Sequence, residues 1–124
     1  MKKQWARQIE INAPIEEVWE FLDGSLENMQ RIMPQVVDHK PIRETEEKVG
    51  SIHRQKYREG KRVIEYDVKT VQYENTPTKK LLQVAFNLAN MFDITAKYEL
   101  EKIDEQKTLF TQLSQSKNTS KHLI

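Results

Sequence analysis

The residues able to carry acid–base chemistry or bind a metal are few and widely separated in this sequence of 124 residues. Its histidines are His39, His53 and His122, and their spacing matches no pattern of paired metal ligands. Cysteine is absent, which excludes disulfides and thiolate metal sites and is typical of a reducing compartment. We therefore expect no metal, no cofactor and no catalytic residue set, and by default a cytoplasmic location.

The sequence also lacks the motifs of the common catalytic chemistries. Its three glycines lie far apart, so there is no Gly-rich phosphate loop and no nucleophile elbow. Asp38 and His39 are neighbours, but consecutive strand residues point to opposite faces, and we predict both to be solvated surface. One acid–base hypothesis remains, which pairs His53 with Tyr57 or Tyr98.

Composition favours one folded domain spanning residues 1–124. Hydrophobic residues make up 37% and charged residues 31%, as in globular proteins. The net charge of +1 gives no overall field to attract nucleic acid or an anionic membrane. No apolar run is long enough to span a membrane, and none follows Met1 as a secretory signal requires.

Hydrophobic spacing predicts a strand, two short helices and then a series of strands. Apolar and polar residues alternate over 5–11, which is typical of a half-buried strand. Pro14 then begins a helical stripe, Asp23-Gly24-Ser25 interrupts it, and Pro34 stops its continuation. From residue 35 to about residue 114, strands alternate with turn signals at 50–51, 59–61, 75–77, 88–90 and 104–107.

Three of these strands present apolar residues on one side. Residues 92–101 alternate strictly between apolar and polar types, and the apolar alternation recurs in 64–68 and 82–88. A one-sided sheet needs a second layer, and two short helices are too small to cover it. The segment 112–124 has no helical stripe, and we predict it to be a polar tail.

The stretch Ile9–Asp23, with its alternating strand followed by Ala13-Pro14 and Val18-Trp19, resembles the opening of the START-related helix-grip superfamily (SRPBCC), which includes the polyketide cyclase/dehydrase-like proteins. The resemblance covers about residues 5–111, with further matches at Pro34, 49–51, 65–68 and Pro77. It implies an α+β fold, a helix-grip-like curved antiparallel sheet of about six or seven strands with two short helices between strands 1 and 2.

Superfamily members typically hold a long C-terminal helix against the sheet, with an apolar cavity between the two. This sequence departs from that pattern near Gln112, where the helix is missing. Three explanations stay open: a shortened or frameshifted reading frame, a cover supplied by a second copy, or an open groove. Because a large exposed apolar patch usually marks an interface, we expect self-association, as a homodimer or otherwise.

The candidate ligand contacts lie on the expected apolar floor and at its mouth. His53, Gln55 and Tyr57 share one face of their strand, where they would supply polar groups to an apolar pocket. Core packing is the alternative role for the aromatic residues and methionines. The candidates are Met29, Met33, His53, Tyr57, Tyr66, Phe86, Met91, Tyr98 and Phe110.

The resemblance implies that the protein binds a small hydrophobic ligand, such as a lipid, a polyketide or another apolar metabolite, in a groove and without covalent chemistry. One alternative is a cyclase- or dehydratase-like enzyme that uses acid–base groups of the cavity. The other is a protein-interaction module, like relatives that activate a chaperone or act on ribosomes or quinones. Fold transfers between relatives better than function does, so these alternatives stay open.

Overall fold

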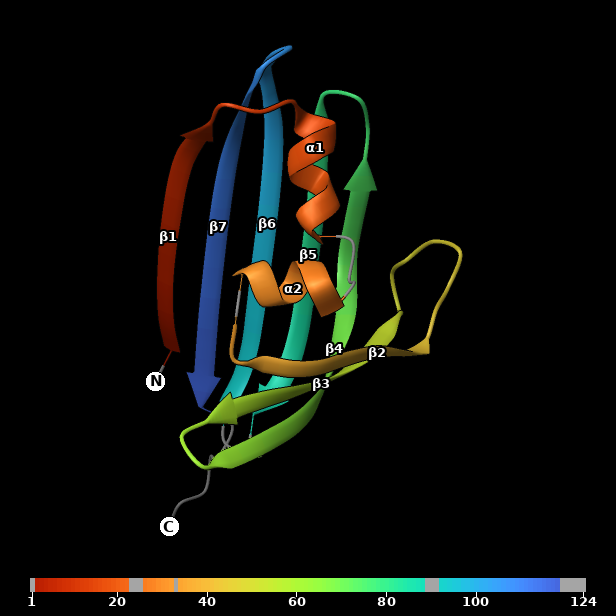
Figure 1. The fold of residues 1–124 in the computed structure, drawn as a ribbon, viewed down its shortest axis with the longest axis vertical. Coiled ribbons are helices and arrows are strands. Elements are labelled where there is room, and N and C mark those ends of the chain that lie inside the picture. The colour runs from red at the N-terminus through yellow and green to blue at the C-terminus, as the bar shows by residue number, and fades with distance from the viewer. Residues whose placement is uncertain (1, 23–25, 33, 89–91, 119–124) are drawn as a thin grey trace.

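The computed structural model describes residues 2–22, 26–32, 34–88 and 92–118, with the backbone alone at residues 2, 29, 32, 88 and 118. Figure 1 shows a curved sheet with two short helices on one of its faces. The elements are β1 (Lys2–Ile11), α1 (Ile15–Trp19), η1 (Glu20–Leu22), α2 (Leu26–Ile32), β2 (Val36–Arg43), β3 (Ile52–Glu59), β4 (Arg62–Asn75), β5 (Lys79–Leu88), β6 (Phe92–Asp104) and β7 (Lys107–Asn118). The predicted helix-grip-like α+β fold is confirmed.

The seven strands form one antiparallel sheet in the order β1-β7-β6-β5-β4-β3-β2. The pairing of β4 with β5 shifts register between Thr70 and Gln72. Such a bulge bends a strand and increases its twist. In Figure 1 the part of β4 before this bend lies with β3 and β2 across the long strands, so the sheet curls around the face that carries the helices.

The turn residues explain the tight strand connections. Glu59 pairs with Arg62, and Gly60 begins the two-residue turn between them with a φ of 61°. Because Lys61, the second turn residue, does not share the positive φ, this is the type II′ geometry, which matches strand twist and favours glycine at the first position. In the β6–β7 turn the Asp104 carboxylate accepts a hydrogen bond from the Gln106 backbone N–H at 2.8 Å. Both turns fall where the sequence predicts them.

Strand β7 corrects the prediction of a polar tail from residue 112. It continues to Asn118, paired with β1 as far as Lys117 and with β6 as far as Asn118. A strand between two neighbours has both rows of its backbone groups available for pairing, so its own sequence need not be apolar. Neighbouring strands therefore hold a segment that the hydrophobic pattern alone does not reveal.

The core lies where α1 meets the sheet. The Pro14 carbonyl accepts hydrogen bonds from the N–H groups of Glu17 and Val18, which starts the helix. Ile15 and Val18 then pack against Leu100 of β6, which is completely buried. We call the sheet face that carries Leu100 and the helices the inner face. By register its side chains include those of Trp5, Arg7, Ile9, Phe110, Gln112, Ser114, Phe92, Ile94, Ala96, Tyr98, Lys80, Leu82, Val84, Phe86, Tyr66, Val68, Thr70, Gln55 and His39.

Candidate ligand-binding face

Aromatic residues from four neighbouring strands line the middle of the inner face. Tyr66 of β4 stacks on Phe86 of β5, with ring centroids 4.9 Å apart and planes 22° from parallel. Tyr98 of β6 lies 6.3 Å from Phe110 of β7 in a tilted arrangement. Such pairs arise because diagonal cross-strand neighbours on one face are within reach of large side chains. They form a floor that is apolar apart from the two hydroxyl groups.

A polar chain meets this floor at Tyr66. The His39 Nδ1 and Gln55 Oε1 atoms are 2.8 Å apart, and the Gln55 amide Nε2 donates to the Tyr66 hydroxyl oxygen at 2.7 Å. Gln55 is buried, so its hydrogen bonds hold the amide in a fixed orientation. The Tyr66 hydroxyl accepts a bond from the protein and keeps its own hydrogen to donate.

His39 lies on the inner face, which corrects the prediction that it is solvated surface. The register pairs His39 with Gln55 and Asp38 with Lys56, and the His39 ring is half-buried. Its imidazole stacks on that of His53, with centroids 5.1 Å apart and planes 13° from parallel. Alternation separates Asp38 from His39 as expected, but the position of β2 beside β3 turns His39 inward.

Burial changes the titration of three groups on this face. It lowers the pKa of His53, and the neighbouring His39 lowers it further, against the opposing effect of Glu44. Burial raises the pKa of Tyr66, although the hydrogen bond from Gln55 acts in the opposite direction. Burial also raises the pKa of Tyr98, with a smaller contribution from Tyr66. Both tyrosines therefore keep their hydroxyl protons at neutral pH and act as hydrogen-bond donors.

The part of the inner face that lies beneath α1, which we call the covered region, contains a buried lysine. Lys80 is 1% exposed, and its Nζ atom lies 3.0 Å from the Glu16 carboxylate and 5.8 Å from the Trp19 ring centroid. The same amine donates to the Asn75 side-chain oxygen. A buried ammonium requires such partners because desolvation is costly. These contacts join α1 to β4 and β5.

Other inner-face side chains are left without a cover, and we call them the open region. Trp5 is 54% exposed, Ile9 51% and Phe92 37%. Between them, the small residues Ala96 of β6 and Ser114 of β7 pair with each other and are buried. In Figure 1 the helices lie over β5 and β6 and leave β1 uncovered. Among the described residues, no helix is long and apolar enough to cross a membrane. The open region therefore exposes large apolar side chains to solvent.

The structure brings most of the predicted contacts together. Tyr66, Phe86, Tyr98 and Phe110 form the floor, while His53 and Tyr57 are half-buried on β3. Met29 lies on α2, but its side chain is not among those described, and Met33 and Met91 lie outside the described residues.

Sequence reasoning missed several members of this face. Trp5 and Ile9 are in phase with the apolar positions of β1, but the predicted contacts include neither of them. Lys80 is in phase with the apolar residues of β5, which is the signal that could have identified a buried lysine.

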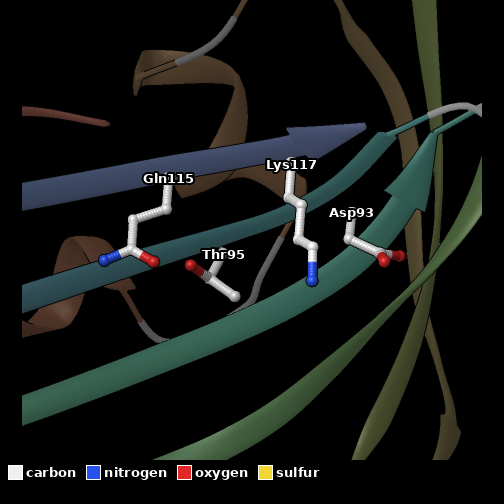
Figure 2. Close-up of a pocket in the computed structure, with 4 residues that line it drawn as sticks. All are labelled: Asp93, Thr95, Gln115 and Lys117. Carbon is white, nitrogen blue, oxygen red and sulfur yellow. The ribbon is translucent and has the colours of Figure 1, made fainter. Parts of the chain in front are cut away.

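Two surface hollows lie away from the floor. One, of about 260 Å³, is lined by Asp93, Thr95, Gln115 and Lys117, and Figure 2 shows these side chains on β6 and β7. Their register places them on the face opposite Tyr98, where every lining side chain is polar. The other, of about 210 Å³, is lined by residues of α1, η1 and α2, most of them charged. No residue of the aromatic floor lines either hollow.

The comparison with protein families decides the classification. A model of the family described as polyketide cyclase / dehydrase and lipid transport matches residues 4–116. The chain belongs to this family. This family and the fold of the chain belong to the helix-grip (SRPBCC) superfamily, which confirms the resemblance seen in the sequence. A sequence search of curated proteins finds no match.

Solved structures share the fold of this family member at low sequence identity. The Zhui aromatase/cyclase from Streptomyces sp. R1128 is 11% identical with a TM-score of 0.75, covering 98% of this chain and 72% of that one. Ara h 8.0201 is 10% identical with a TM-score of 0.73, covering 100% and 83%. Norcoclaurine synthase from Thalictrum flavum, solved with dopamine and hydroxybenzaldehyde, is 14% identical with a TM-score of 0.68, covering 94% and 69%. At these identities the likeness establishes the fold alone.

Proposed function

We propose that the protein binds a small, planar apolar molecule on the aromatic floor of its inner face without forming a covalent bond to it. The observation that carries this proposal is the continuity between the floor and the open region. Tyr66, Phe86, Tyr98 and Phe110 meet exposed apolar side chains that the described residues do not cover. A flat aromatic or fused-ring ligand would replace water on both, and burial of apolar area would drive the association.

The polar chain suggests which group the ligand carries. Gln55 fixes the Tyr66 hydroxyl by donating to it, so the hydroxyl hydrogen can point to a carbonyl or hydroxyl oxygen of the ligand. The raised pKa of Tyr66 keeps that hydrogen in place at neutral pH. An apolar ring system with an oxygen acceptor near one edge therefore fits this face best. The family description, which names polyketide cyclases and lipid transport, is consistent with such ligands.

Probe binding tests the proposal. In a fluorescence titration with anilinonaphthalene sulfonate, replacing Trp5 and Ile9 together by serine should weaken binding about tenfold, because two exposed apolar contacts are lost. The matched control replaces Gln4 and Gln8 by serine. These residues are exposed on the same strand but point to the opposite face. Equal affinities for both double variants would contradict binding on the inner face.

Acid–base catalysis is the second candidate, because titratable groups gather at the same place. The lowered pKa of His53 favours the neutral imidazole, which can accept a proton, and the protonated hydroxyls of Tyr66 and Tyr98 can donate one. Once a converted substrate is found, His53→Asn and Tyr66→Phe should each lower kcat with the fold unchanged. Unchanged turnover in both variants would leave binding as the function.

A further inference from the structure

Strand β1 is an unprotected edge of the sheet. It pairs with β7 on one side, and no other described strand lies beside it. It runs for ten residues with an uninterrupted register, and every residue from Lys3 to Glu10 is exposed. The backbone groups that point away from β7 are a ready template for another strand.

The opposite edge is built differently. Strand β2 has eight residues, contains Pro41, and shows two register shifts in its pairing with β3. Proline and bulges are the usual devices that stop an edge from pairing with another chain. Only one of the two edges is therefore suited to strand addition, and it is the edge beside the exposed Trp5 and Ile9.

We propose that β1 pairs antiparallel with β1 of a second copy, about a two-fold axis that passes beside Ala6. This register places Trp5 opposite Arg7 of the second copy, and Gln4 opposite Gln8. Residues directly opposite each other point to the same face, so the indole and the guanidinium would meet on the inner face. Twofold symmetry repeats each contact.

The side chains that would meet are available for these contacts. Within the described residues Arg7 has no ion pair, and its guanidinium can lie over the half-exposed Trp5 ring. Gln4 and Gln8 carry no charge that would oppose the approach.

Charge selects this register over its neighbours. The two inner faces must lie on the same side of the joined sheet. In the next possible register, each residue therefore pairs with a residue two positions away from its partner in the proposed register. One such shift sets Arg7 opposite Arg7, and the other sets Lys3 opposite Arg7. Like charges directly opposite each other are destabilising, so Lys3 and Arg7 disfavour every nearby alternative. Two copies joined in this way extend the inner face across Trp5 and Ile9.

Disulfide trapping tests the register, because the chain has no cysteine of its own. In the Ala6→Cys variant the two thiols would face each other across the axis, with Cα atoms about 5 Å apart, inside the range a disulfide needs. When the variants are oxidised at equal concentration, Ala6→Cys should form covalent dimer at least about tenfold faster than Gln4→Cys or Gln8→Cys. In each of these two controls, the cysteine of one copy lies four positions along the strand from the cysteine of the other copy. The double variant Gln4→Cys/Gln8→Cys should again cross-link readily.

Sedimentation equilibrium tests the association itself. The full chain should be a reversible dimer, and Ala6→Lys should raise its dissociation constant about tenfold by placing two ammonium groups opposite each other. Gln4→Lys adds the same charge to the same face opposite a glutamine and should have little effect. A monomer at every concentration would overturn the proposal. So would a dimer whose Ala6→Cys variant cross-links no faster than Gln4→Cys, because the interface would then lie elsewhere.

Discussion

The covered and open regions lie on the same face of the same sheet, yet their side chains differ in burial. Ile9, Phe110 and Leu100 are cross-strand neighbours in one row, and the row runs from an isoleucine that is 51% exposed to a leucine that is fully buried. The difference arises because α1 lies over Leu100, while β1 forms an uncovered edge. Packing under the helix stabilises the fold, and the remaining apolar surface is where we propose that the ligand binds.

Replacing the residue at each end of this row by alanine should show which of the two stabilises the fold. Leu100→Ala should lower the free energy of unfolding by about 3 kcal/mol, because it removes buried methyl groups and leaves a cavity. Ile9→Ala removes a side chain of similar size and should cost less than about 1 kcal/mol, since half of that side chain already meets water. Urea unfolding measures both values. A cost for Ile9→Ala as large as that for Leu100→Ala would show that the open region is also core.

The ion pair beneath α1 should give the next largest effect. Glu16→Ala leaves the buried Lys80 ammonium without its carboxylate and should destabilise the fold by about 2 kcal/mol. Lys80→Met removes the charge and keeps the length, so adding it to Glu16→Ala should recover most of the loss. The double-mutant cycle, measured by urea unfolding, isolates the coupling. Strictly additive costs would mean that the pair does not attach α1 to the sheet.

Ligand selectivity should reveal the hydroxyl at the floor. Acetylnaphthalene carries a carbonyl that can accept from Tyr66, and ethylnaphthalene has the same shape without it. The protein should prefer the ketone about fivefold, equivalent to about 1 kcal/mol, and Tyr66→Phe should abolish that preference while keeping the stacked ring. Tyr98→Phe is the control, because its hydroxyl is not positioned by Gln55. A preference that survives in Tyr66→Phe would place the ligand oxygen elsewhere.

The smallest expected effect is on how the stability of the fold depends on pH. Because the folded-state pKa of His53 is lowered from its ordinary value of 6.5, the unfolded chain binds the proton more readily. The stability that His53 contributes is complete above that ordinary value and is lost as pH falls through the lowered pKa. His39, Glu44 and Lys48 set the charge around it. His53→Gln should flatten the dependence of urea unfolding on pH below 6.5, and an unchanged slope would contradict this assignment.

The sequence predicted those parts of the fold whose signal is local. Alternation and turn residues located the strands, and Pro14 and Pro34 bounded the helical region. The extension of β7 to Asn118 was not visible, because β1 and β6 hold that polar segment by backbone pairing. Edge position is likewise a property of the whole topology, so alternation alone could not show that Trp5 would be exposed.

The candidate site was predictable in its aromatic floor and not in its polar chain. Tyr66, Phe86 and Tyr98 followed from strand phase, which assigns them to one face. The contact between His39 and Gln55 depends on how β2, with its bulges, aligns beside β3, and single-strand periodicity carries no information on such a register. The contact between Lys80 and Glu16 joins elements far apart in the sequence.

The most direct test of the inner face as the binding site is a residue-by-residue map of amide chemical shifts during titration with acetylnaphthalene. We predict that the largest shifts cluster at the floor and the open region, around Ile9, Phe86 and Tyr98, with little change at Thr95 and Gln115 on the opposite face. Shifts centred on the polar hollow around Thr95 and Gln115, or no saturable shifts at all, would contradict it.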